Sequence, residues 1–275
     1  MPDRRALVGR RYELAGLRVD AAASNTYAEV IGDDPTRHQD RGTASPFYAV
    51  ALIAPLWRSI YQSSELDTDD QSVLHAEQRM LLHRELRIGA ELTAEAEVAD
   101  VVGFGFNDAA VIRCRLLDSD GRPVVSMEST LAVQGSSGYP ATSRRAATPT
   151  KGEPAATLHC VFDADVPRRY ADAADDHNPL HLDDDAARAA GHPSRIVHGM
   201  ATLATGISAL VNKLREAPDV RLGYLRARFS RPVLPGDAVD FTAYATRSTG
   251  TYVVGASLDQ RPVLKNCWLR LAGGE

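Results

Sequence analysis

The two halves of the chain repeat one another. The segment LLDSDGRPVVSMESTLAV (116–133) resembles SLDQRPVLKNCWLRLA (257–272), since each reads as a strand, a tight turn and a second, alternating strand. The segment LLHRELRIGAEL (81–92) likewise resembles FSRPVLPGDAVDF (229–241), with a basic residue and a glycine at matching positions. This self-similarity predicts an internal duplication, so the chain should contain two copies of one structural unit.

A stretch rich in Gly, Ser, Thr and Pro, GSSGYPATSRRAATPTKGEP, separates the two halves and has no apolar periodicity. The sequence therefore predicts an N-terminal domain over residues 1–134, a linker over 135–154 and a C-terminal domain over 155–275. A chain of 275 residues with 44% hydrophobic residues is large enough to bury a core in each domain.

Each half reads as a helix followed by amphipathic strands. In the second half, apolar residues recur with a period of 3.6 over 199–215, which predicts a long and mostly buried helix. Alternating segments separated by Gly, Pro and Asp predict antiparallel strands near 222–230, 238–247, 251–258 and 262–272. The predicted fold class is α+β, with an antiparallel sheet wrapped on one helix in each half.

Charge and cysteine patterns exclude several kinds of partner. The formal net charge is −5 and no Arg/Lys run with interleaved aromatic residues occurs, so nucleic acid is not an expected partner. The three cysteines are far apart and lack CxxC spacing, which favours reduced thiols. The most apolar window, FYAVALIAPLW (47–57), is too short to span a membrane, and the first residues lack the apolar region of a signal peptide. We therefore expect a cytoplasmic protein with no membrane partner.

Four of the eight histidines lie within residues 170–200. Local structure explains part of this segment: Asp165 is a candidate N-cap for a short helix that should end near Ala174. Pro179 cannot continue that helix, so the chain must turn there. A second short helix, capped by an aspartate, should end at Gly191.

Caps do not explain the combination of YADAADDHNPLH (170–181) with IVHGM (196–200). This pattern resembles the signature of the MaoC-like, R-specific enoyl-CoA hydratases and their acyl-carrier-protein dehydratase relatives, which are hot-dog proteins. The duplicated layout of helix and sheet resembles the double hot-dog members over nearly the whole chain. The resemblance implies a double hot-dog with two helix-wrapped antiparallel sheets.

The resemblance also implies Asp176 and His181 as a catalytic pair, with the backbone N–H of Gly199 as the oxyanion donor. The implied activity is the reversible hydration of a trans-2-enoyl thioester of CoA or an acyl carrier protein to the R-3-hydroxyacyl thioester. Hydration needs a base for water and a proton for C2, and a carboxylate with an imidazole can share a water. Neither a cofactor nor a metal is implied, and a homodimer of double hot-dogs is compatible with the family. The residues implied in substrate binding or orientation are Asn178, Tyr170, His198 and Met200.

One departure concerns the residues before the catalytic aspartate. Many family members have a small polar residue and a glycine there, whereas this chain has Ala174 and Asp175. The helix end and the Asp175 carboxylate should both raise the pKa of Asp176. The departure leaves a non-catalytic acyl-thioester-binding subunit open as an alternative, beside a hot-dog thioesterase.

The histidines also have interpretations other than catalysis. His177 and His181 have the i,i+4 spacing of a zinc pair, but Pro179 breaks the helix that such a pair requires. For the remaining titratable residues we expect structural roles on strands or solvated and capping roles on loops: His75 and His83 for the former, His192 and Asp183 to Asp185 for the latter.

The first half carries a weaker version of the motif, YAEVIGDDPTRH (27–38), in which Asp33 and His38 keep the five-residue spacing. The motif lacks its asparagine, and only 13 residues separate Asp33 from Pro46, whereas the second half has 23 between Asp176 and the start of its helix. We therefore predict a degenerate first domain that accommodates the acyl chain and has no second working site.

The helix expected within SPFYAVALIAPLWRSIY (45–61) contains Pro55, which predicts a kink or break. A broken helix would free space for an acyl chain beside the sheet. Six apolar residues either line that space or pack the first-half core: Phe47, Val50, Leu52, Ile53, Leu56 and Trp57.

Overall fold

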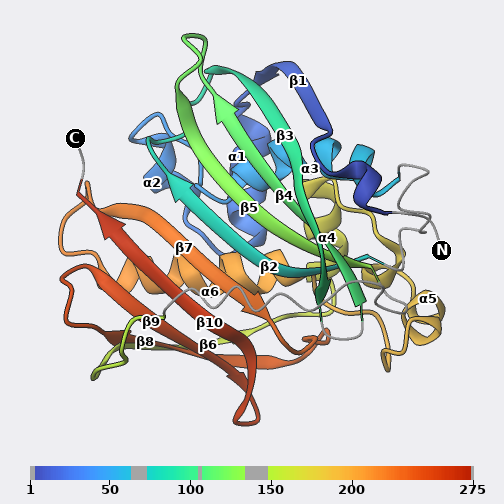
Figure 1. Cartoon of the computed structure of the whole chain (residues 1–275). Helices are drawn as coiled ribbons and strands as arrows, with labels where there is room; N and C mark the ends of the chain where they lie inside the picture. Colours follow the sequence, from blue (N-terminus) through green and yellow to red (C-terminus); the bar gives the residue numbers. More distant parts are fainter. Residues whose placement is uncertain (1–3, 63–72, 105–106, 134–147, 274–275) are drawn as a thin grey trace.

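The computed structural model describes residues 4–62, 73–104, 107–133 and 148–273 (Figure 1). The first half contains η1 (Arg4–Leu7), β1 (Arg11–Arg18), α1 (Ala21–Val30), α2 (Pro35–Gln39), α3 (Tyr48–Tyr61), β2 (Val73–Leu82), β3 (Glu91–Phe104), β4 (Asn107–Leu117) and β5 (Pro123–Val133). The second half contains β6 (Pro154–Val161), α4 (Val166–Ala174), η3 (Pro179–His181), α5 (Asp184–Ala189), α6 (Gly199–Leu214), β7 (Arg221–Phe229), β8 (Ala238–Ala245), β9 (Thr251–Leu258) and β10 (Arg261–Ala272).

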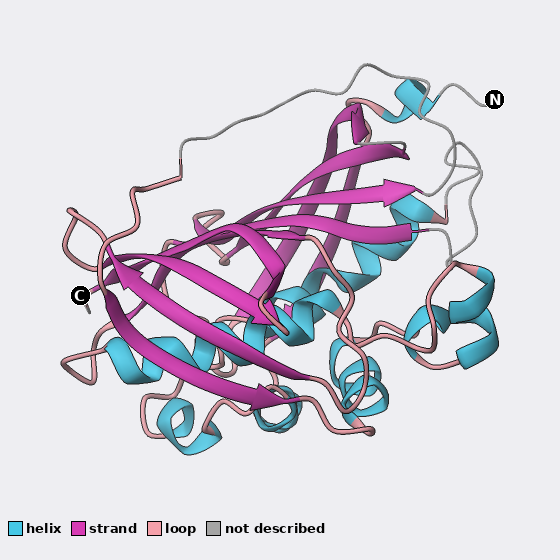
Figure 2. Cartoon of the chain, turned by 90° about the horizontal axis from the view of Figure 1, so that it is seen from below, coloured by secondary structure: helices cyan, strands magenta, loops and turns pink. Residues whose placement is uncertain are grey.

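The strands form one antiparallel sheet in the order β1-β3-β4-β5-β2-β7-β10-β9-β8-β6. The first five positions belong to the first half and the last five to the second, so the two sheets of the prediction join edge to edge through β2 and β7. Their antiparallel register runs from Glu77 opposite Arg228 to Leu81 opposite Tyr224. Figure 2 shows the helices gathered on one side of this sheet, where α3 contacts strands of the first half and α6 contacts strands of the second. This is the double hot-dog architecture that the sequence predicted.

The repeated sequence segments fold into equivalent structures. The hairpin of β4 and β5 corresponds to the hairpin of β9 and β10. Gly89 and Gly236 both have positive φ, 79° and 95°, and both lie in the turn before a long strand. A side chain would be strained in this conformation, which explains why glycine recurs at both positions.

Predictions for the second half agree with the structure to within a few residues. The predicted strands correspond to β7, β8, β9 and β10, and the predicted long helix is α6. The short helices are also found as α4 and α5. The side chain of Asp183 caps α5 by accepting the N–H groups of Asp185 and Ala186 at 2.7 and 2.8 Å, and Gly191 follows its end with φ 87°. Asp165 occupies the N-cap position of α4 but makes no capping hydrogen bond.

Of the kink or break expected at Pro55, the break does not occur. The helix α3 runs from Tyr48 to Tyr61 with Pro55 inside it. Proline removes one helical hydrogen bond and costs about 3 kcal/mol in a helix interior. Residues on both sides of it, such as Ile53 and Ile60, are fully buried. Tertiary packing of these turns therefore maintains the helix where local propensity would end it.

The predicted linker lies mostly outside the described residues, which resume at residue 148. Residues 148–153 form neither helix nor strand, and β6 begins at Pro154. The division into domains at 134 and 155 stays a prediction. Among the described residues, no helix is long and apolar enough to cross a membrane.

Close packing of α6 on the sheet generates a testable prediction at Gly206. A Cβ atom built there would lie 2.1 Å from Cε1 of Phe241 on β8. The change Gly206→Ala improves helix propensity by about 1 kcal/mol but overpacks a buried contact, which typically costs about 1–3 kcal/mol or more. We expect a net loss of unfolding free energy in urea denaturation, and no such loss for Thr205→Ala on a half-exposed position of the same helix. An alanine variant as stable as the parent would contradict the packing described here.

Candidate active site

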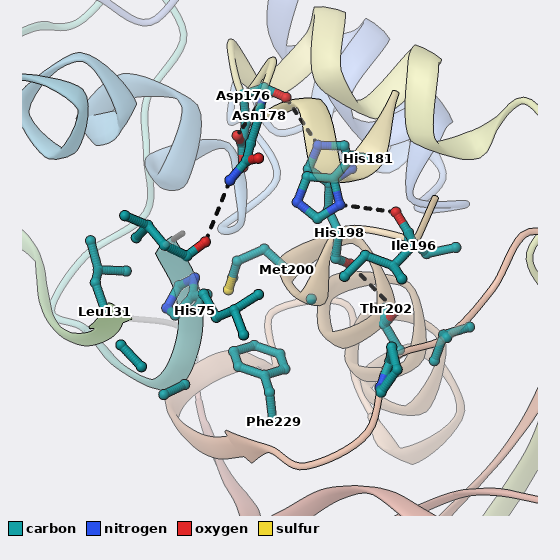
Figure 3. A pocket seen from close by; sticks show the side chains of 18 of the residues that line it. His75, Leu131, Asp176, Asn178, His181, Ile196, His198, Met200, Thr202 and Phe229 are labelled. Carbon is teal, nitrogen blue, oxygen red and sulfur yellow. Dashed lines mark hydrogen bonds between the residues drawn. The ribbon is translucent and has the colours of Figure 1, made fainter. Parts of the chain in front are cut away.

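A cavity of about 300 Å³ lies between the two halves (Figure 3). From the first half, its wall takes the start of β2 and four residues of α3 with helical spacing: Val50, Ala54, Trp57 and Tyr61. From the second half, it takes the segments around residues 174–181 and 196–202 and the end of β7. Of the six apolar residues considered above, Val50 and Trp57 line this cavity, whereas the other four belong to the buried core without lining it: Phe47, Leu52, Ile53 and Leu56.

Asp176 lies in the turn after α4, with its side chain partly exposed to the cavity. One carboxylate oxygen accepts the backbone N–H of Asn178 at 3.4 Å. The backbone carbonyl of Asp176 accepts a hydrogen bond from Nε2 of His198 at 3.0 Å. The carboxylate and the backbone carbonyl of Asp176 thus have different hydrogen-bond partners, and the second carboxylate oxygen takes part in neither bond.

His181 lies in the short helix η3. Its Nδ1–H donates to the carbonyl of Ile196 at 2.9 Å, which assigns the neutral tautomer and leaves Nε2 as a proton acceptor. The imidazole stacks on that of His198, with ring centroids 3.7 Å apart and planes at 28° (Figure 3). A fixed ring with one free, unprotonated nitrogen is suited to accept a proton.

Asp176, His181 and His198 each place one side-chain N or O atom within 4.8 Å of the others. The carboxylate and the His181 imidazole are therefore close enough to bind one water molecule between them. The three groups could in principle hold a metal ion. However, the two imidazoles are stacked, so their in-plane lone pairs run side by side and do not converge on one point. The alternative zinc pair has no support either, because His177 is exposed and bonds to Asp172 at 3.2 Å.

Gly199 is the first residue of α6, so its N–H belongs to the first turn, where the amide groups have no acceptor within the helix. It borders the cavity, and a Cβ atom there would lie 3.1 Å from the ring of Phe229. The preceding residue, His198, occupies the N-cap position without a capping side-chain hydrogen bond. The positive end of a 16-residue helix therefore faces the cavity beside Asp176 and His181.

The four residues implied in substrate binding also border the cavity. Asn178 accepts the N–H of Leu180 at 3.1 Å and donates to the carbonyl of Val73 at 3.4 Å, which ties the loop to β2 of the first half. Tyr170 is buried and shares a hydrogen bond of 2.9 Å between its hydroxyl and that of Tyr27. Its ring contacts that of His198, with centroids 4.8 Å apart. Tyr170 and His198 thus support the loop, while Met200 contributes an apolar surface to the wall (Figure 3).

The pKa of Asp176 is lowered, and the expectation of a raised value is wrong. Burial by itself raises the pKa of this carboxyl, but His198, His181 and the N–H of Asn178 together outweigh it. The neighbouring Asp175 carboxylate pairs instead with Arg58 of α3 at 2.8 Å. Burial lowers the pKa of His181 despite the opposing effect of Asp176, and it lowers that of His198 to about 3. The site therefore contains an ionised carboxylate and neutral imidazoles at neutral pH.

Asp175 has a left-handed backbone conformation, with φ 54° and ψ 40°, and ends α4. This conformation costs a residue with a side chain roughly 1–2 kcal/mol relative to glycine. Arg58 binds both the carboxylate and the backbone carbonyl of Asp175. An ion pair from the first half thus stabilises the turn that carries Asp176, at the position where the resemblance implies a glycine.

Sequence reasoning missed several wall residues. His192 was expected to be solvated or capping, but it is half-buried, borders the cavity, and is among the charges that act on His181. His75 donates from Nε2 to Gln78 at 3.0 Å and also borders the cavity, with its ring between those of Trp57 and Phe229. No local motif marks these positions, because they reach the cavity from other elements. His83 bonds to Ser126 at 2.9 Å, as a structural histidine.

The weaker motif of the first half has a different geometry. Nε2 of His38 lies 2.8 Å from Oδ2 of Asp33, which also accepts the hydroxyl of Ser45 at 2.9 Å. A direct contact leaves no room for a shared water. Only α2 fills the stretch between Asp33 and Pro46, whereas η3, α5 and a loop fill the corresponding stretch of the second half.

Each half of the chain is similar to a known domain. Residues 143–252 match the MaoC like domain, and residues 6–127 match the FAS1-like dehydratase domain region. A MaoC-like dehydratase structure from Phytophthora capsici covers 98% of this chain and 97% of its own at a TM-score of 0.81 and 20% identity. A Mycobacterium tuberculosis structure described as a double hotdog fold covers 97% and 96% at a TM-score of 0.63 and 16% identity. The chain is therefore a double hot-dog protein.

Two curated relatives extend the comparison. The 3-hydroxyacyl-thioester dehydratase Y of Mycobacterium tuberculosis is 32% identical over 185 residues, 64% of this chain and 62% of that one. The peroxisomal multifunctional enzyme type 2 of Drosophila melanogaster is 28% identical over 187 residues, 65% of this chain and 31% of that one. The chain thus spans less than two thirds of the length of these relatives. It combines a region that matches the FAS1-like dehydratase domain region with one that matches the MaoC like domain, which agrees with the resemblance noted in the sequence.

The buried histidines predict a loss of stability in mild acid. Burial lowers the pKa of His75 to about 4 and that of His198 to about 3, whereas both should titrate near 6.5 in the unfolded chain. The unfolded state therefore binds more protons below about pH 6.5, and the free energy of unfolding should fall as the pH drops from about 6.5 to 4.5. Urea denaturation across this range measures the slope. His75→Gln should reduce it, and His177→Gln, at an exposed position, should leave it unchanged; equal slopes for all three proteins would contradict the prediction.

Proposed function

We propose that the chain is a hydro-lyase that reversibly adds water to trans-2-enoyl thioesters of CoA or an acyl carrier protein and forms R-3-hydroxyacyl thioesters. The observation that carries the proposal is the trio of Asp176, His181 and the Gly199 N–H around one cavity. The match of residues 143–252 to the MaoC like domain and the names of the dehydratase and multifunctional-enzyme relatives support it.

In the proposed mechanism, a water molecule lies between the Asp176 carboxylate and Nε2 of His181. The ionised carboxylate accepts one hydrogen bond and orients the water, and the neutral imidazole accepts the proton as the oxygen adds to C3 of the enoyl group. The imidazolium is then stabilised by the nearby carboxylate and returns the proton to C2. Water is thereby added across the double bond with no net change in the protein.

Negative charge develops on the thioester oxygen during the addition. The Gly199 N–H at the start of α6 is the proposed donor to this oxygen, because it combines an unused amide with the positive end of the helix dipole. Glycine keeps this position open, since a Cβ would already be tight against the Phe229 ring. His198 and Asn178 are proposed to position the loop and not to exchange protons, since Nε2 of His198 and the side-chain amide of Asn178 are bonded to backbone groups and burial lowers the pKa of His198 to about 3.

The first prediction of the proposal concerns the dyad. Asp176→Asn and His181→Ala should each lower kcat/KM for crotonyl-CoA hydration by a factor of about 100 or more, because each removes a group that handles the water proton. Loss of the conjugated enoyl absorbance measures hydration, and release of free thiol in the same assay would reveal thioester hydrolysis instead.

The equivalent residues of the first half provide the matched control. Asp33→Asn and His38→Ala should change kcat/KM far less, because these two side chains contact one another directly and lie outside the main cavity. Near-normal kcat/KM in either dyad variant would contradict the assignment of Asp176 and His181 as the catalytic pair. A loss of kcat/KM of similar size in the first-half variants would reveal a second working site.

The second prediction concerns the acyl chain. We propose that it lies against the α3 stripe of Val50, Ala54, Trp57 and Tyr61. Each buried methylene contributes roughly 0.8 kcal/mol, so kcat/KM should rise several-fold for each two-carbon step, and enoyl thioesters of eight or more carbons should exceed crotonyl-CoA.

A variant pair tests where the acyl chain lies. Ala54→Leu fills the cavity and should shift the preferred chain to shorter lengths. Ala51→Leu adds the same atoms at a half-exposed position of α3 outside the cavity wall and should not. A preference for four carbons in the parent, or an identical length profile in both variants, would contradict this placement.

A further inference from the structure

A second, smaller pocket of about 90 Å³ occupies the equivalent place in the first half. The main cavity is formed by the Asp176 loop, α3, the start of β2 and the end of β7. The smaller one is formed by the Asp33 motif, α6, the end of β2 and the start of β7. The two are therefore related by the duplication, and we refer to the smaller one as the twin pocket.

The helix that lines each pocket differs in character. The main cavity faces the largely apolar stripe of α3 described above, whereas the twin pocket faces Ser208, Val211, Asn212 and Arg215 near the end of α6. A hydroxyl, an amide and a guanidinium thus stand where the first-half helix presents aliphatic and aromatic groups. This wall is unsuited to an acyl chain and suited to a polar ligand.

Positive charge exceeds negative charge in the wall of the twin pocket. Two carboxylates, Asp33 and Glu85, oppose five arginines: Arg37, Arg41, Arg84, Arg215 and Arg221. Three of the arginines are committed to protein acceptors. Arg41 binds Glu85 at 2.6 Å, Arg84 binds Asp118 at 2.7 Å, and Arg221 donates to the carbonyls of Leu82 and His83 at 3.2 and 3.3 Å.

The other two arginines have N–H groups that are not used in hydrogen bonds within the described residues. Arg37 has only a distant ion pair, 3.8 Å from Asp34, and its Nη1 is buried without a hydrogen-bond partner among the described residues. The Arg215 side chain has no hydrogen bond or ion pair within the described part of the chain. Burial, together with the charges of Arg37 and Arg41, lowers the pKa of Arg215. Guanidinium groups that crowd one another in this way would be relieved by an anion.

Ser208 adds an independent observation. Its side chain is only 5% exposed and lines the twin pocket, yet its hydroxyl has no hydrogen-bond partner among the described residues. The Asp33 carboxylate in the same pocket accepts hydrogen bonds from His38, Ser45 and Asn212, and none from Ser208. Buried polar groups of folded proteins are nearly always bonded, so the unused donors point to an acceptor that the chain itself does not supply.

We propose that the twin pocket binds one phosphate group, as free phosphate or as the end of a small phosphate monoester, through Arg37, Arg215 and Ser208. Planar guanidinium forks and a hydroxyl match the oxygens of a phosphate. The pocket volume of about 90 Å³ is sufficient for one phosphate group.

Isothermal titration calorimetry of the full chain with sodium phosphate, at constant ionic strength, tests the proposal. We expect saturable binding at one site, weakened about tenfold or more in Arg215→Gln and in Ser208→Ala, because a charged hydrogen bond contributes roughly 1.5–3 kcal/mol. Arg247→Gln, at an exposed position outside the pocket, is the control and should bind as the parent does. Thermal unfolding without phosphate checks that each variant is folded.

A variant of opposite sign sharpens the test. Asp33→Asn removes a negative charge from the pocket wall and should tighten phosphate binding, whereas general damage to the pocket would weaken it. Glycerol 3-phosphate distinguishes a monoester from free phosphate, and malonate tests a dicarboxylate. Absence of saturable binding, an affinity equal to that of the parent in Arg215→Gln and Ser208→Ala, or binding of malonate but not of either phosphate would overturn the proposal. None of these readouts uses catalysis, so they stand apart from the proposed function.

Discussion

The antiparallel pairing of β2 with β7 determines where everything else in this molecule lies. The two strands are the inner edges of the two halves, and their hydrogen bonds make one sheet of ten strands. Because they run in opposite directions, the start of β2 lies beside the end of β7, and the end of β2 beside the start of β7. Each of these junctions is covered by one long helix and one loop motif, so the pairing creates two related pockets, one at each end of the seam.

The two pockets show how a duplicated backbone can diverge in chemistry. In the second half, the longer stretch before α6 keeps Asp176 and His181 apart but close enough to share a water. In the first half, the shorter stretch lets Asp33 and His38 bond directly. The two long helices differ in a corresponding way. The helix α3 lines the main cavity with largely apolar side chains, whereas α6 lines the twin pocket with mostly polar ones. Each half thus supplies the wall for the other half's motif.

Features encoded by neighbouring residues could be predicted from the sequence. The helix α6, strands β7 to β10 and the cap at Asp183 all follow from periodicity or turn chemistry within a few residues. The edge strands β1 and β6 were not recognised, because their side chains alternate between half-exposed and exposed and give a weak apolar signal. The continuity of α3 through Pro55 and the lowered pKa of Asp176 depend on distant packing and on His198, which no local pattern reveals. The same holds for His192, whose place in the cavity wall comes from tertiary structure alone.

The contact between Arg58 and Asp175 has a consequence for how such chains can change over time. A left-handed aspartate at the end of α4 depends on an arginine 117 positions earlier in the sequence, on the half that lacks the catalytic motif. A glycine there would need no such partner. The two halves are therefore coupled at this contact, so a first half without an arginine at position 58 would bring the same fold but not the residue that anchors the loop. Recombination between family members should preserve residues 58 and 175 as a pair, much as it preserves the two sides of a subunit interface.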